Sequence, residues 1–280
     1  MNQGMRDETE TGGRSRTQEA ATEQYFPPPA PAPSNLSGSL RPHPSSLRVL
    51  LWDIDGTLIR STRVGAFKDY TVPMLEGVFG TAGRLPQMTV SGMTDLQIVI
   101  EALRDEGFTR EGIRERLADL KTRYMQELDR VTQTDGELFH LLPGVREALE
   151  ATAAHPRYKN ALVTGNIEPA AHLKVQLFGL AEFFTLPGAY GDESYDRNDL
   201  PALAAGRINA QLNLDLNPSQ FVVIGDTPND IACARHFGAK AVAVATGRMN
   251  SVDTLLACGP DALLPDLSDL GLVMRTLDSL

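Results

Sequence analysis

Short apolar runs alternate with longer amphipathic segments along most of this 280-residue chain, and the alternation limits the folds that it can adopt. The runs are rich in β-branched and aliphatic residues and end in polar residues or glycine, as strands do. Strands are expected at 48–52, 161–164, 221–225, 241–245 and 262–264. Strands that alternate with helices are joined by right-handed crossovers into a mostly parallel sheet. The predicted fold class is therefore α/β, with a doubly wound parallel sheet.

Helical spacing fills the intervals between these strands, at 143–154, 169–178, 200–211 and 229–237. Residues 62–140 break the alternation, because they hold no convincing buried strand. Helices are expected there at 67–79, 94–106 and 110–131, and Thr94 followed by Gln97 fits a helix cap. We interpret 62–140 as a helical cap domain inserted after the first strand, with 47–61 and 141–280 as the core domain.

Residues 1–46 differ in composition from the rest of the chain, since proline, serine and glycine crowd a segment with few large apolar residues. Such a segment cannot bury enough apolar area to offset its ordering entropy, so a disordered tail is expected. The chain has only 2 cysteines and no apolar block typical of a signal peptide near residue 1. These features favour a cytoplasmic protein.

The charge balance is acidic, with 26 Lys and Arg against 36 Asp and Glu, for a formal net charge of −10. A general nucleic-acid partner is not expected, because phosphate backbones need clustered basic residues. No apolar run is long enough for a membrane span. A small anionic partner stays open, because a local site is enough to attract it. The oligomeric state is expected to be monomer or homodimer.

Two aspartates, Asp53 and Asp55, directly follow the first predicted strand and precede Gly56. Residues i and i+2 of an extended segment point to the same side, so both carboxylates can face one pocket. They repel each other unless one is protonated or a cation lies between them. The pattern favours Mg²⁺, held by oxygen ligands, and split roles as nucleophile and general acid and base. An Asp-Gly turn with a spare aspartate is the alternative.

Two further strand ends carry polar groups. Asp226 follows the strand at 221–225, and Asp230 begins the next helix, where both could complete a cation site. The alternative is helix capping by Thr227 or Asn229, with the acids there to favour the helix dipole. Thr164, Gly165 and Asn166 follow the strand at 161–164, and a hydroxyl with free backbone N–H groups could bind phosphate oxygens. An ordinary strand-to-helix loop is the alternative there.

Taken together, these sites resemble the haloacid dehalogenase superfamily over about residues 48–270. The first family motif, an apolar strand followed by DxDGT, is matched by Asp53 to Thr57. A threonine at a strand end is matched by Thr164, and the last motif, GDxxxD, by Asp226 and Asp230. The Leu-Pro-Gly-Val run at 142–145 is similar to the phosphoglycolate phosphatase-like branch.

The resemblance implies a Mg²⁺-dependent phosphatase in which Asp53 attacks phosphorus and becomes an aspartyl phosphate. Asp55 would protonate the leaving oxygen and then deprotonate the hydrolytic water. Asp53, the backbone carbonyl of Asp55, and Asp226 would ligate Mg²⁺, with Asp230 as a further ligand or a support of the site. Thr164 would hold the phosphoryl group. The expected substrate is a small phosphorylated metabolite: phosphoglycolate first, with sugar phosphates and nucleotides open.

One departure concerns the cation of the site, because the family's lysine before the last motif has no counterpart here. Arg197 occupies roughly that position, and Lys174 lies on the helix that follows the phosphate loop. Either could neutralise Asp53 and the phosphate, and we place Lys174 slightly ahead because a helical side chain leans toward the helix N-terminus.

The predicted cap supplies candidate substrate contacts. Thr94 and Asp95 follow a Gly-containing loop that is similar to a cap loop of the family, although helix capping explains Thr94 equally well. Arg60 and Arg63 could meet a substrate carboxylate, with a solvated surface role as the alternative. The alternative functions are a phosphomutase of the β-phosphoglucomutase type, which uses the same aspartates, and a catalytically inactive binding protein on the same fold.

Overall fold

The structure, a computed structural model, describes residues 46–134 and 137–280. The predicted disordered tail, residues 1–46, lies outside the described residues except at its last position. The described residues all belong to one of the two units into which the chain divides, the unit that ends at Leu280.

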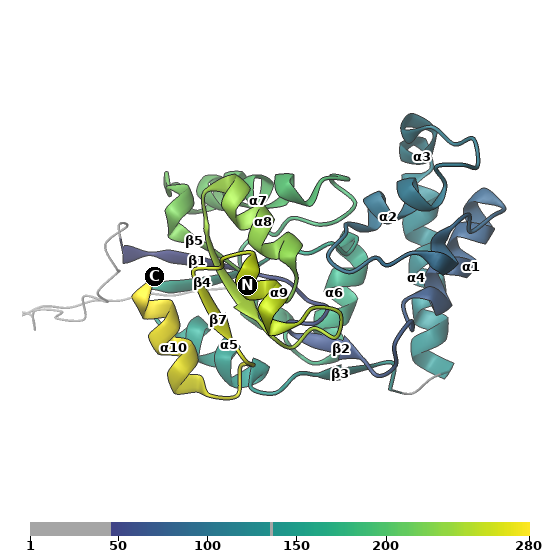
Figure 1. Ribbon diagram of the computed structural model, residues 1–280. Coiled ribbons are helices and arrows are strands. Elements are labelled where there is room, and N and C mark those ends of the chain that lie inside the picture. The colour runs from purple at the N-terminus through teal and green to yellow at the C-terminus, as the bar shows by residue number, and fades with distance from the viewer. Residues whose placement is uncertain (1–45, 135–136) are drawn as a thin grey trace, which may run out of the picture. The chain divides into compact units, whose positions relative to one another are not determined.

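A five-stranded parallel sheet forms the centre of the fold (Figure 1). Its strands lie in the order β4-β1-β5-β6-β7. Its strands run in parallel because each is joined to the next by a helical crossover. The order reverses between β1 and its two neighbours, β4 and β5. In open sheets of this kind, ligands bind at such a reversal, beyond the carboxyl ends of the strands. The strands are β1 (Arg48–Trp52), β4 (Tyr158–Leu162), β5 (Phe221–Gly225), β6 (Lys240–Val244) and β7 (Ala262–Leu264).

Both faces of the sheet are buried. Successive residues of a strand point to opposite faces, and each face packs in its own apolar cluster. Leu50 and Trp52 of β1 join one apolar cluster, and Val49 and Leu51 join a second. The first cluster includes residues of α5 (Val145–Ala154), α6 (Glu168–Leu177) and α10 (Leu270–Ser279). The second includes residues of α7 (Leu200–Leu212), α8 (Pro228–Phe237) and α9 (Val252–Ala257). The predicted doubly wound α/β fold is confirmed.

A helical segment, which we call the insert (residues 62–138), separates the first strand from the rest of the sheet. It contains α1 (Lys68–Phe79), α2 (Asp95–Ala102), α3 (Arg110–Glu115) and α4 (Leu117–Thr134). Two short antiparallel strands, β2 (Ile59–Ser61) and β3 (Phe139–Leu141), pair where the chain leaves the core and returns to it (Figure 1). This pairing sets the two connections side by side.

Several elements differ from those expected. The strand predicted at 161–164 is β4, at 158–162; it lies at a sheet edge, where the exposed Lys159 interrupts the apolar pattern. The helix predicted at 110–131 is two helices that part at Arg116, and the helix predicted at 94–106 ends at Ala102. The missed elements are β2, β3, α9 and α10; the two strands have three residues each, too few to show a period.

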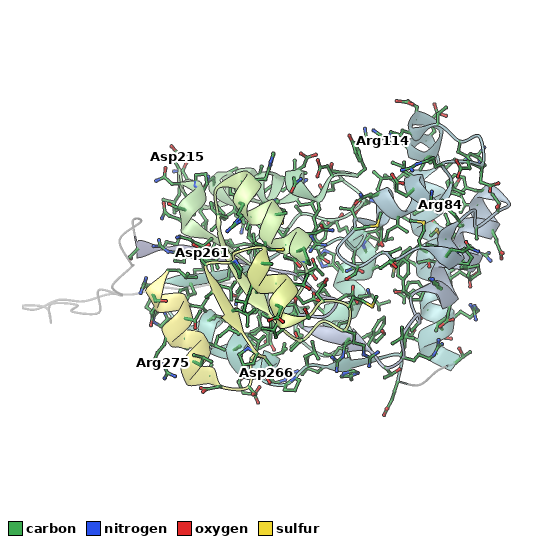
Figure 2. All side chains as sticks on the ribbon, in the orientation of Figure 1. Arg84, Arg114, Asp215, Asp261, Asp266 and Arg275 are labelled. Atoms are coloured by element: carbon green, nitrogen blue, oxygen red, sulfur yellow. The ribbon has the colours of Figure 1, made fainter. Side chains whose placement is uncertain are left out.

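Charged side chains cover the periphery of the described unit. Arg84 and Arg114 of the insert, and Asp215 and Arg275 of the core, are exposed at its surface (Figure 2). Among the residues that the structure describes, no helix combines the length and the apolar character that a bilayer crossing needs.

Candidate active site

Two buried carboxylates lie at the carboxyl ends of neighbouring strands. Asp53 follows β1 and Asp226 follows β5, and the register pairs Trp52, one residue before Asp53, with Ile224, two residues before Asp226. The backbone N–H of Asp53 donates to the carbonyl of Ile224 at 3.0 Å, which continues the pairing into the site. The parallel sheet thus brings the first and last sequence motifs together, although the two aspartates are 173 positions apart in the chain.

Glycines enclose the carboxylate of Asp226. A Cβ atom at Gly56 or at Gly247 would overlap with this carboxyl group, so only glycine allows the backbone to approach it on these sides. Gly56 also has a φ of 93°, which glycine adopts at no steric cost. The hydroxyl of Thr57 donates to Asp226 Oδ1 over 3.4 Å. The Gly-Thr pair of the first motif therefore serves to position the aspartate of the last one.

Arg197 is the cation that contacts Asp53. It lies in a single 3₁₀ turn, Arg197–Asp199, just before α7, and its side chain is buried. Its Nη2 atom donates to Asp53 Oδ1 at 2.9 Å and to Asp230 Oδ1 at 2.5 Å. Burial alone would lower the pKa of Arg197, but the charges of Asp230 and Asp53 raise it by more than burial lowers it. The guanidinium therefore stays charged. Of the two cations that the sequence offers, Arg197 holds this position.

Asp230 has a structural role as well as a place at the site. Its Oδ2 atom accepts hydrogen bonds from the backbone N–H and the hydroxyl of Thr227, at 2.9 and 2.7 Å, and Thr227 caps α8 in return. The capping by Thr227 that the sequence offered as the alternative is therefore present, and Asp230 is its partner in the cap. Because both of its oxygens have partners, Asp230 helps to fix Arg197 beside Asp53.

Three carboxylates, those of Asp53, Asp226 and Asp230, have oxygens within 4.8 Å of one another. Burial raises the pKa of Asp53 to about 6 even though Arg197 opposes the shift. Burial, together with Asp230 and Asp53, raises the pKa of Asp226 well above its usual range. One guanidinium does not compensate for three buried acids. The donor set, all carboxylate oxygen, suits a hard divalent cation such as Mg²⁺.

Lys174 serves the second aspartate of the first motif. From α6, its buried Nζ atom donates to Asp55 Oδ2 at 2.7 Å and to Asn166 Oδ1 at 2.6 Å. The amide of Asn166 donates in turn to Asp55 Oδ2 at 2.7 Å and to Thr164 Oγ1 at 2.8 Å. Burial would lower the pKa of Lys174, but Asp55 raises it above the ordinary lysine value. These bonds hold Asp55, whose side chain is 44% exposed, in one orientation.

The loop after β4 brings the predicted phosphate-binding residues to the same place. Thr164, Gly165 and Asn166 line one cavity together with Asp53 and Asp55. A Cβ atom at Gly165 would overlap with the backbone carbonyl of Met93, so the insert approaches this loop closely. The structure therefore brings these three residues together with both aspartates.

The first turn of α2 connects the insert to this loop. The backbone N–H of Asp95 donates to the carbonyl of Gly165 at 2.7 Å, and Asp95 Oδ2 accepts from the backbone N–H of Ile167 at 2.9 Å. Burial raises the pKa of Asp95 to about 7, although the Ile167 N–H opposes the shift. Asp95 also lines the cavity. Its side chain is both a link between insert and core and part of the cavity wall.

Thr94 does not form the substrate contact expected of it. It is fully buried, its hydroxyl accepts from the backbone N–H of Gln97 at 3.1 Å, and it is absent from the lining of the cavity. The predicted helix cap is confirmed instead. Capping is the better use of this hydroxyl, because the first N–H groups of a buried helix otherwise have no partner.

A cavity of about 390 Å³ holds the site between the strand ends and the insert. Arg60 lines it, as expected for a candidate substrate contact, whereas Arg63 lies outside the lining and pairs with Asp69.

The sequence analysis did not identify Gly247 and Tyr70, which also line the cavity. Gly247 follows the strand predicted at 241–245, so the rule that sites collect at strand ends could have identified it. Tyr70, on α1, had no such signal.

The chain matches a known protein family over both aspartate motifs. The family model described as haloacid dehalogenase-like hydrolase matches residues 50–235, which cover more than half of the chain. The chain belongs to this family. A second model, HAD-hydrolase-like, matches residues 202–270. The resemblance stated from the motifs and the predicted hydrolase class are confirmed.

Individual relatives are distant. The chain is 25% identical over 236 residues to a phosphoglycolate phosphatase of Vibrio vulnificus, covering 80% of this chain and 94% of that protein. The structure of a predicted phosphoglycolate phosphatase of Haemophilus somnus superposes with a TM-score of 0.55 at 22% identity, covering 82% of this chain and 98% of the other. The structure of CbbY of Rhodobacter sphaeroides in complex with phosphate superposes with a TM-score of 0.56 at 19% identity, covering 80% and 96%. These superpositions confirm the fold.

Proposed function

We propose that this family member is a Mg²⁺-dependent phosphatase that hydrolyses a small phosphomonoester through an aspartyl phosphate on Asp53. One observation carries the proposal. Asp53 and Asp55 lie two residues apart, yet each is held by a different buried cation, Arg197 for Asp53 and Lys174 for Asp55. Two carboxylates in different surroundings can take different roles in one reaction.

In the first step, an oxygen of Asp53 attacks phosphorus and the bond from phosphorus to the leaving oxygen breaks. Asp55 gives its proton to that oxygen, so an alcohol departs. In the second step, Asp55 takes a proton from water while the water oxygen attacks phosphorus, which releases phosphate and restores the carboxylate of Asp53. Asp55 suits the proton transfer because its exposed carboxyl group faces the cavity and two hydrogen bonds orient it.

Charge compensation is the main demand of phosphoryl transfer. Arg197 neutralises part of the charge on Asp53, which lets an anionic phosphate approach. Asp53 and Asp226 would hold Mg²⁺, with the Asp55 carbonyl and Asp230 beside them, and the bound ion would withdraw charge from the phosphoryl oxygens. Thr164 and the loop after it would hold the phosphoryl group. The insert would act as a cap that limits the entry of water.

The names of the relatives support this activity. The Vibrio protein is named phosphoglycolate phosphatase, and the CbbY structure contains phosphate. We propose a small phosphorylated metabolite as the substrate and the cytoplasm as the location.

The test is phosphate release from a panel of 2-phosphoglycolate, sugar phosphates and nucleoside monophosphates, with Mg²⁺ and with EDTA. Turnover that needs Mg²⁺, and that Asp53→Asn and Asp55→Asn both abolish, is the expected result. The exposed Asp215→Asn is the matched control and should keep wild-type rates. An isomerised sugar phosphate without free phosphate would indicate a phosphomutase. Binding of phosphate without turnover would indicate an inactive binding protein.

A further inference from the structure

The entrance to the cavity is built by two chain segments that hold each other in place. We call them the rim: residues 60–64, which comprise the end of β2 and the residues after it, and residues 246–249, which follow β6. Arg60 Nη1 donates to the carbonyl of Thr246 at 2.9 Å, and Arg248 Nη2 donates to the carbonyl of Thr62 at 3.3 Å. The hydroxyl of Thr246 donates to the carbonyl of Gly56 at 2.5 Å, which connects the rim to the first motif. Five of its side chains, those of Arg60, Ser61, Val64, Arg248 and Met249, line the cavity.

Two of the rim residues are apolar and exposed. Val64 is 77% exposed and Met249 is 58% exposed, and neither belongs to the two apolar clusters of the fold. A single exposed apolar side chain is ordinary, but these two line the same cavity. Folding therefore gives no reason for apolar residues at both positions, whereas an apolar ligand would cover them.

The facing wall, from the insert, is also apolar. Met88, Val90 and Met93 precede α2 and line the cavity. They are half-buried, whereas Thr89 and Ser91, which alternate with Met88 and Val90, are exposed. Thr89 and Ser91 line the cavity as well, and the three apolar side chains also pack against the first apolar cluster of the fold. A cavity of about 390 Å³ with apolar walls on both sides is larger and less polar than a two-carbon leaving group needs.

The cations of the entrance bind backbone carbonyls rather than acids. Arg60, Lys68 and Arg248 line the cavity and donate to such carbonyls, Lys68 to that of Pro86 at 2.6 Å. Among the described residues, none of the three forms an ion pair with a carboxylate. The Arg63 side chain next to them, by contrast, pairs with Asp69. Cations that are held in place without a counter-charge favour an anionic ligand group.

We propose that the leaving group of the substrate has an apolar body, of about the size of an aromatic ring, and carries an anionic group of its own. The body packs between Val64 and Met249 of the rim and the Met88–Met93 wall, and the anionic group lies at Arg60 and Arg248. This inference rests on the proposed function. It narrows the substrate class to phosphomonoesters whose alcohol contains a ring or branched chain and also carries an anionic group.

Four phosphomonoesters separate the two features: ethyl phosphate, 2-phosphoglycolate, benzyl phosphate and 4-carboxybenzyl phosphate. All have alkyl leaving groups, so differences in leaving-group acidity are small. We expect kcat/KM for benzyl phosphate to exceed that for ethyl phosphate by about ten-fold or more, since each buried CH₂ contributes about four-fold. The carboxylate of 4-carboxybenzyl phosphate should add about three-fold or more, and about 0.5 M salt should remove that gain.

Single substitutions test which residues produce the preference for the benzyl group and which produce the preference for the carboxylate. Met249→Gln should reduce the benzyl-to-ethyl ratio several-fold, and Arg248→Met should bring the carboxylate preference close to one. Met125→Gln, on α4, and the exposed Arg275→Met have no contact with the cavity and should keep both ratios. Loss of a ratio in these controls would mean that the wild-type preference arises elsewhere, and would overturn the assignment to the rim.

Equal kcat/KM values for ethyl and benzyl phosphate would overturn the inference while leaving the phosphatase proposal standing. Absence of turnover with all four esters and with the panel of sugar phosphates and nucleoside monophosphates would refute the proposed function instead. In that case the dissociation constants of ethylphosphonate and benzylphosphonate, measured calorimetrically with Mg²⁺ present, decide the inference. Tighter binding of benzylphosphonate by about ten-fold supports it, and equal binding refutes it.

Discussion

Replacing Asp95 with asparagine should stabilise this protein at alkaline pH but much less at acidic pH. Asp95 is 6% exposed at the start of α2, and its carboxylate accepts a hydrogen bond from the Ile167 N–H. Asparagine has nearly the same shape, and its amide oxygen can accept that bond. The substitution therefore removes a buried charge while it keeps the link between insert and core.

The magnitude depends on the pKa. Burial raises the pKa of Asp95 from its ordinary 3.8 to about 7. An acid with a raised pKa contributes stability that is complete below the unfolded pKa and is lost as pH rises through the folded pKa. The difference of about 3 in pKa corresponds to about 4 kcal/mol lost at pH 8, and to about 2 kcal/mol lost at pH 5. Asp95→Asn should recover these amounts.

The measurement is urea unfolding of the wild type and the variant at pH 5 and at pH 8. A gain of about 4 kcal/mol at pH 8 corresponds to a rise in Tm of about 8–16 °C for a unit of this size. Asp105→Asn is the control, because Asp105 is exposed shortly after α2 ends, and its effect should stay within about 0.5 kcal/mol at both pH values.

A gain that does not change with pH would show that charge burial at Asp95 is not its cause. A loss of stability at pH 8 would contradict the prediction more strongly. That result would show that the carboxylate contributes more through attraction to Lys174 than burial costs it.

Three further predictions concern the site. Arg197→Met leaves buried acids without their cation and should cost about 3–5 kcal/mol of stability. Thermal unfolding of the variant in EDTA and in Mg²⁺ should show that the metal restores part of this stability. No recovery with Mg²⁺ would contradict the divalent site. Lys174→Met removes one of the two hydrogen bonds that orient Asp55 and should lower kcat by about 100-fold or more. Circular dichroism should show that the fold is intact. An unchanged kcat would contradict the role of Asp55 in proton transfer. Gly247→Ala forces the neighbouring carboxylate to move and should raise the Mg²⁺ concentration needed for half-maximal activity. The control is Gly206→Ala, which meets no atom within 4 Å and should gain up to about 1 kcal/mol from helix propensity.

The sequence predicted most of the fold because local patterns carry most of its information. β1, β5 and β7 have the predicted bounds, since their apolar runs are continuous and end at Gly or directly before a polar residue or proline. The predicted bounds of β4 differ from the observed ones because an edge strand is buried less completely and Lys159 interrupts its apolar run. The short strands β2 and β3 depend on each other for their hydrogen bonds, and no local pattern reveals such a pair.

The sequence by itself also determined which residues could form the site, since each motif follows a strand and parallel strands end at one edge of a sheet. It did not determine which cation serves which aspartate. That choice depends on where α6 and the turn before α7 place two buried side chains, Lys174 on Asp55 and Arg197 on Asp53. The cavity wall was likewise decided by tertiary structure, because Val64 and Met249 become neighbours of the site only when the two rim segments hydrogen-bond to each other. Contacts between distant segments depend on packing and backbone geometry, which leave no periodic signal in the sequence.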